Sequence, residues 1–171
     1  PYEGRMRAML IFAFFPLLAL AAQPLGYVSY WVPIIIIGIA GAAHQAWSAN
    51  IFTTVGDMFP KKAIATITGI GGLAGGLGST LINKSSGVLF DYTRKTMSTI
   101  DGQPLLEKFP KFATESIPES FLKDLEGTGA VVFDGINTGY MIIFSICAVC
   151  YLTGWIVMKS LVPKYSPITD L

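Results

Sequence analysis

Residues 8–56 read AMLIFAFFPLLALAAQPLGYVSYWVPIIIIGIAGAAHQAWSANIFTTVG and contain no Asp, Glu, Lys or Arg in 49 consecutive positions. Two shorter charge-free runs follow, 21 residues at 63–83 and 24 residues at 135–158. A bilayer core of about 30 Å is crossed by roughly 20 apolar residues of helix. The long run therefore predicts two crossings joined by a turn, and each shorter run predicts one.

The composition of the whole chain supports a membrane protein. Of its 171 residues, 52% are hydrophobic and 13% are charged, and the mean hydropathy is +0.56. Soluble domains carry about 25% charged residues, so this chain has too few charges to cover a water-facing surface. The net charge of +1 and the absence of a basic stripe give no indication of a nucleic-acid partner.

The charge pattern predicts an all-α, integral membrane bundle of four transmembrane helices. We expect the helices at about 7–22, 30–52, 63–90 and 137–161, with Pro and Gly at 23–26 ending the first. Residues 91–136 form a polar loop, and 162–171 form a tail. Within that loop, residues 121–125 are a candidate short surface helix. Because the chain starts at Pro1, we expect it to be the C-terminal part of a longer polypeptide.

Basic residues flank the predicted helices in three short segments. They are Arg5 and Arg7, Lys61 and Lys62, and Lys159 and Lys164. Four crossings place all three segments on one side, which the positive-inside rule assigns to the cytoplasm. The loop at 91–136 would then be extracytoplasmic and the C-terminus cytoplasmic, as in a multi-pass protein of the cell (inner) membrane.

The second predicted helix carries a polar cluster in its second half. Its members are His44, Gln45, Trp47, Ser48 and Asn50. His44, Gln45 and Ser48 fall within one helical arc, with Trp47 at its border. Polar groups in hydrocarbon are costly unless they have a partner. The cluster therefore forms hydrogen bonds between helices, or it lines a cavity for a polar, hydroxylated solute, with the indole stacking on a sugar face.

The third predicted helix is rich in glycine. Gly72 and Gly76 lie four residues apart, as do Gly71 and Gly75, and small residues at this spacing allow close helix packing in lipid. The segment also resembles a dinucleotide-binding or phosphate-binding loop, but those motifs require a preceding strand that the sequence lacks. Lys84, after this run, either pairs with a substrate carboxylate or extends to the membrane interface.

The sequence offers no basis for enzyme chemistry. Cys147 and Cys150 lie in the last apolar run and supply two of the four ligands that a structural zinc site needs. Acidic residues are confined to the predicted loops and tails. We expect no catalytic residues, no metal site and no cofactor.

Residues 43–63, AHQAWSANIFTTVGDMFPKKA, followed by GIGGLAG at 69–75, resemble the hexuronate branch of the anion:cation symporter family in the major facilitator superfamily. The resemblance implies that the four helices are the last four of a twelve-helix fold, the two middle ones bordering the cavity. It implies cation-coupled symport of sugar acids, with H⁺ as the usual cation, by alternating access. It assigns the polar cluster to substrate binding and Asp57, Lys61 and Lys62 to the cytoplasmic link or gate. The carboxylate anchor and proton-coupling acids would lie in the missing N-terminal helices.

The alternative is a membrane sensor or assembly subunit that does not transport and works through its long outer loop.

Overall fold

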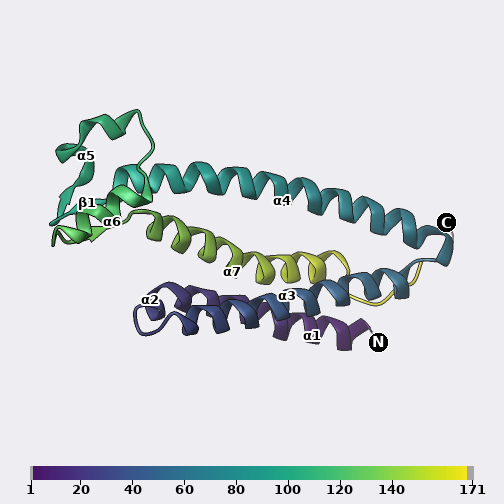
Figure 1. The fold of residues 1–171 in the computed structure, drawn as a ribbon. Coiled ribbons are helices and arrows are strands. Elements are labelled where there is room, and N and C mark those ends of the chain that lie inside the picture. The colour runs from purple at the N-terminus through teal and green to yellow at the C-terminus, as the bar shows by residue number, and fades with distance from the viewer. Residues whose placement is uncertain (1, 169–171) are drawn as a thin grey trace. The chain divides into compact units, whose positions relative to one another are not determined.

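A computed structural model describes residues 2–168, and four of its helices are long and apolar enough to cross a membrane (Figure 1). These spans are Tyr2–Gly26, Trp31–Met58, Lys61–Met97 and Ile136–Leu161. The chain divides into two compact units: one holds the residues up to Gly78 and from Phe144 onward, and the other holds 79–143. Of the predicted tail, residues 169–171 lie outside the described range.

The first span consists of three consecutive helical segments: α1 (Tyr2–Phe14), the 3₁₀ helix η1 (Phe15–Ala21) and α2 (Ala22–Gly26). The change from α to 3₁₀ geometry coincides with Pro16, which has no N–H for the helical ladder. The predicted turn at 23–26 is wrong, since these residues are helical and the chain reverses at 27–30. Pro24 is tolerated there because it lies in the first turn of α2.

In the first unit, α3 (Trp31–Met58) packs along α1, η1 and α2. A buried row on α1, formed by Tyr2, Met6 and Met9, has the spacing of one helix face. The C-terminal part of α7 (Ile136–Leu161) packs against the same row. Trp155 Nε1 donates a hydrogen bond to the Met6 carbonyl at 2.8 Å, so the indole fastens α7 to α1.

The start of α1 and the ends of α3 and α7 meet at one end of this unit. Arg5 on α1 forms an ion pair with Asp57 near the end of α3. The Tyr2 hydroxyl donates to the carbonyl of Val162, directly after α7. The three segments that carry the predicted flanking basic residues thus lie at one end of this unit.

α4 (Lys61–Met97) has 37 residues and runs seven residues beyond the predicted end at Phe90. At 1.5 Å per residue it is roughly 55 Å long, well beyond the bilayer core of about 30 Å. Its last turns carry Asp91, Arg94 and Lys95. Charge alone predicts that the helix ends before these residues, but helical geometry continues outside hydrocarbon.

In the second unit, the segment between α4 and α7 folds around its own apolar core. It contains β1 (Thr99–Ile100), β2 (Gln103–Pro104), α5 (Leu105–Lys108), η2 (Pro110–Ala113), α6 (Glu119–Gly127) and β3 (Val132–Phe133). The strands form an antiparallel sheet in the order β2-β1-β3. Helix α6 confirms the short helix predicted at 121–125, whereas the all-α prediction did not include the sheet.

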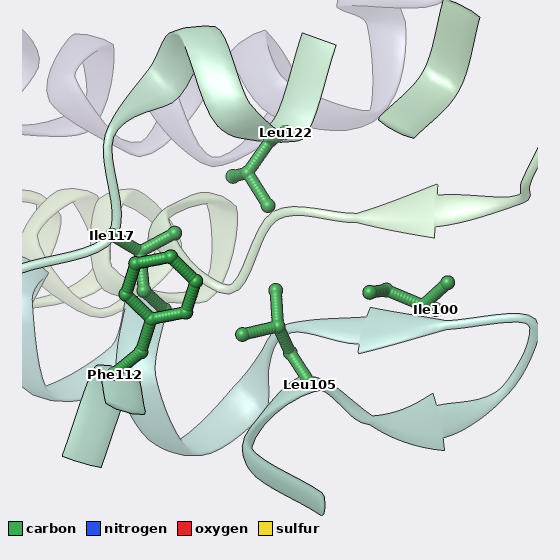
Figure 2. Close-up of a cluster of buried hydrophobic side chains, with 5 residues drawn as sticks. All are labelled: Ile100, Leu105, Phe112, Ile117 and Leu122. Atoms are coloured by element: carbon green, nitrogen blue, oxygen red, sulfur yellow. The ribbon is translucent and has the colours of Figure 1, made fainter. Parts of the chain in front are cut away.

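The core of this second unit is built from side chains far apart in the loop (Figure 2). Its buried members are Ile100, Leu105, Phe112, Ile117 and Leu122. Phe109, Phe112 and Phe121 pack together around it, with ring centroids 4.8–6.4 Å apart. The segment is therefore a compact small fold rather than an extended connection.

Candidate functional site

The polar cluster of α3 meets α7 at Tyr151. The Tyr151 hydroxyl lies 2.5 Å from Nδ1 of His44, within hydrogen-bonding distance. The Tyr151 ring also meets the His44 and Trp47 rings edge-on, with centroids 5.9 and 5.5 Å apart. Two of the five predicted binding residues are thus held by one tyrosine from another helix, and His44 remains exposed.

Trp47 lies between the apolar core of the first unit and the polar cluster. Its ring packs against the buried row on α1, and a Cβ added at Gly154 would lie 3.5 Å from the indole. Its Nε1 is buried, and no described residue accepts a hydrogen bond from it. Burying an N–H without a partner is costly, so Trp47 has a donor still to be satisfied.

The other predicted binding residues are less constrained. Asn50 Nδ2 donates to the Ala46 carbonyl at 2.8 Å, which turns its amide back onto α3. Gln45 is exposed and Ser48 is half-buried, and neither forms a hydrogen bond with another residue in the range 2–168. The structure therefore brings His44 and Trp47 together, leaves Gln45 and Ser48 available, and engages Asn50 locally.

The predicted gating residues lie at the end of the first unit where the start of α1 meets the ends of α3 and α7. We call this the charged end. Arg5 Nε is 2.7 Å from Asp57 Oδ2. The tail reaches the same place: Tyr165 Oη donates to the Asp57 carbonyl at 3.1 Å, and the Ile168 N–H donates to the Met58 carbonyl at 2.8 Å. Lys61 and Lys62 are exposed and form no ion pair with a described residue. Of these three residues, Asp57 is the one that connects different parts of the unit, since it contacts Arg5 on α1 and Tyr165 in the tail.

The glycines predicted for helix packing lie on an exposed part of α4. A Cβ added at Gly71, Gly72, Gly75 or Gly76 would meet nothing within 4 Å among residues 2–168. Their role as a helix-packing surface therefore stays a prediction.

Sequence reasoning missed two residues of the site. Tyr151 lies alone in an apolar run, and the sequence gives no sign that it faces His44. Tyr165 lies in the polar tail, where neither periodicity nor hydropathy predicts a contact with Asp57. The sequence predicts Arg5 as a flanking basic residue, and the structure shows that it pairs with Asp57.

The chemistry available at this site is that of hydrogen-bonding groups and aromatic faces. An imidazole, a phenol, an indole, an amide and a hydroxyl are well suited to a polyhydroxylated solute. No group of three or more His, Cys, Asp or Glu side chains among the described residues could hold a metal ion. The cluster contains no Lys or Arg. It therefore offers a carboxylate solute no permanently charged partner.

Comparison with known proteins finds a partial similarity to transporters. The hexuronate transporters of Escherichia coli strains K12 and O157:H7 are each 38% identical to this chain over 61 residues. The aligned region covers 36% of this chain and 14% of either relative. No protein-family model and no solved structure matches the chain. Four apolar helices and this local similarity together indicate a membrane protein related, over part of its length, to a transporter.

Proposed function

We propose that this chain is the C-terminal part of a secondary transporter that carries hexuronates or related organic anions together with a cation. The observation that carries the proposal is the 38% identity over 61 residues to a hexuronate transporter. The four apolar helices supply the membrane-spanning framework that such a role requires. In this proposal they are the last four of twelve helices of a major facilitator fold, completed by N-terminal helices of the same polypeptide.

The polar cluster on α3 would form one wall of the substrate site. His44 and Tyr151 present hydrogen-bonding groups that can exchange donor and acceptor roles, and Trp47 offers an apolar face to a sugar ring. The site lacks a fixed cation, so a carboxylate anchor and the proton-coupling acids would come from the N-terminal helices. Binding near the membrane midplane between two halves is the usual arrangement in such transporters.

The charged end of the first unit would face the cytoplasm. The Arg5–Asp57 pair and the contacts around it bring together the segments that carry the flanking basic residues. A concentration of Lys and Arg near the membrane favours the cytoplasmic side. The ion pair at Asp57 would then act as a cytoplasmic gate contact of an inner-membrane protein, formed in one state of the transport cycle.

The proposal is tested by uptake into proteoliposomes made with the complete protein. Uptake of labelled glucuronate and galacturonate is measured with and without an inward pH gradient. Trp47→Ala and Gln45→Ala are expected to lower uptake at unchanged protein incorporation. Trp31→Ala and Gln103→Ala, at positions away from the cluster, are the matched controls. Normal uptake by both cluster variants would remove the assignment of the site.

A second function is favoured by one observation, the independent core of the outer segment. A mere connection needs no such core, so a sensor or assembly subunit could use this small fold as its working surface. Replacing residues 99–132 with a flexible linker distinguishes the two. Uptake survives the replacement if the chain transports, whereas a sensing or assembly role is lost.

A further inference from the structure

A cavity of about 190 Å³ lies between α1 and α7 at the charged end of the first unit. Its lining residues are Glu3, Met6, Arg7, Trp155 and Lys159. It is separate from the polar cluster around His44, and nothing in the transport proposal uses it. We propose that this cavity binds the headgroup of an anionic phospholipid.

The two cations of the cavity lie at the boundary of the apolar helices. Arg7 directly precedes the charge-free run that begins at Ala8, and Lys159 directly follows the run that ends at Met158. In a membrane this boundary is the level of the lipid headgroups. A phosphodiester at this depth would meet both cations, whereas the acyl chains would lie along the apolar surfaces of α1 and α7.

Arg7 has the free binding capacity that the proposal requires. Arg5, two residues earlier, is engaged by Asp57, but Arg7 is exposed and forms no hydrogen bond or ion pair with any residue between 2 and 168. A guanidinium binds phosphate oxygens through two parallel hydrogen bonds. Arg7 is therefore the principal phosphate ligand of the proposed site.

The opposite wall of the cavity is held in place by other contacts. Trp155 donates its Nε1–H to the Met6 carbonyl, which fixes the indole between the helices. Lys159 donates to the Pro163 carbonyl at 3.0 Å and lies over the Tyr2 ring. An ammonium has three donors, so Lys159 retains capacity for a phosphate oxygen while its position is fixed.

Glu3 favours a lipid headgroup over free phosphate. Its carboxylate repels a small dianion but can accept hydrogen bonds from the hydroxyl groups of a glycerol headgroup. The phosphodiester of phosphatidylglycerol carries one negative charge and is accompanied by such hydroxyls. The cavity's two cations and one anion leave a single positive charge to match it.

The test uses the complete protein in an uncharged detergent, titrated separately with short-chain phosphatidylglycerol, short-chain phosphatidylcholine and inorganic phosphate. Binding is followed by calorimetry. Phosphatidylglycerol is expected to bind most tightly. Arg7→Gln should weaken it about tenfold, the effect of losing one charge-assisted interaction. Lys62→Gln is the matched control, since it removes a charge from an exposed position outside the cavity.

Three results would overturn the proposal. Equal losses in Arg7→Gln and Lys62→Gln would mean a diffuse attraction to the basic end. Equal affinities for the two lipids would mean that the headgroup charge is not recognised. Inorganic phosphate that binds as tightly as phosphatidylglycerol and competes with it would identify a free-anion site instead. None of these measurements depends on transport activity.

Discussion

Arg5 Nε lies 2.7 Å from Asp57 Oδ2, and this ion pair joins the start of α1 to the end of α3. Both side chains are somewhat over a quarter exposed, so solvent screens the attraction. We expect a coupling free energy of about 0.5–1 kcal/mol in a double-mutant cycle. The cycle is built from Arg5→Ala, Asp57→Ala and the double variant, with unfolding followed in detergent.

A charge-swapped variant tests whether the stability comes from the ion pair or from the individual side chains. Arg5→Asp with Asp57→Arg should recover part of the stability that either single swap loses, because the attraction is restored with its sign pattern reversed. Added salt should reduce the coupling. Independent, additive effects of the two alanine substitutions would show that the pair contributes nothing measurable.

Tyr151→Phe removes the hydroxyl that reaches His44 but retains the ring that meets Trp47. If His44 contacts substrate, the loss of this hydrogen bond should raise the KM for uptake about 2- to 10-fold, as expected for about 0.5–1.5 kcal/mol. Tyr92→Phe, at an exposed position on α4, is the control. An unchanged KM together with normal incorporation would show that Tyr151 is not part of the substrate site.

The sequence predicts the membrane helices well because each of them contains a long run of uncharged residues. The runs at 8–56, 63–83 and 135–158 each correspond to helical structure, since a low-dielectric solvent imposes the same requirement on every residue of a crossing. The ends of the helices are less well determined. Hydropathy marks where the chain leaves hydrocarbon, whereas α4 continues as a helix to Met97.

The small sheet between α4 and α7 could not be predicted in the same way. Its strands have two residues each, which is too short for alternation to show. The turn between β1 and β2 has positive φ at Asp101 and Gly102, the conformation of a two-residue hairpin for which Asp-Gly is favoured. That dipeptide was the one local signal available. No local sequence pattern indicates the pairing of His44 with Tyr151, because the two residues are 107 positions apart.

Leu105→Ala tests whether the segment between α4 and α7 has its own stability. Leu105 is fully buried in the core shown in Figure 2, and removing such a side chain costs about 2–5 kcal/mol. We expect faster hydrogen exchange at 99–133 with little change in α3. Val131→Ala, at a position 73% exposed, should leave exchange nearly unchanged. Equal effects of the two substitutions would contradict a packed core.

Asp101 should make the segment between α4 and α7 sensitive to acid. The hydrogen bond from the Val131 N–H, followed by the nearby Lys108 ammonium, lowers the pKa of the Asp101 carboxyl below its ordinary value of 3.8. A lowered folded-state pKa contributes stability that is present above the unfolded value and is lost as pH falls through the folded one.

The Asp101 prediction is checked by following the Val131 amide resonance in the complete chain from neutral pH to about pH 2.5. The wild-type signal should titrate below the ordinary aspartate range. Asp101→Asn is the control, since Asn also tolerates the left-handed backbone but carries no titrating proton. An identical pH response in the variant would assign the acid sensitivity to another group.

Gly135 occupies a position between the end of α4 and the start of α7 where a side chain does not fit. A Cβ there would lie 2.1 Å from the Thr93 carbonyl oxygen and 2.9 Å from the backbone nitrogen of Ser98. The Gly135 N–H also donates to Ser98 Oγ at 2.9 Å, in a buried setting. Relief of the clash must therefore move backbone, which would disturb that hydrogen bond.

Gly135→Ala should destabilise the second unit by about 1–3 kcal/mol, the usual cost of overpacking. The adjacent bidentate pair of Arg94 with Asp134, at 2.7 and 3.1 Å, should be disturbed as well. Gly127→Ala, with open space around its Cβ, is the matched control and should be close to neutral. Thermal unfolding and hydrogen exchange at 91–140 measure both variants. A Gly135→Ala protein as stable as the control would mean that this approach of α4 to the start of α7 is wrong.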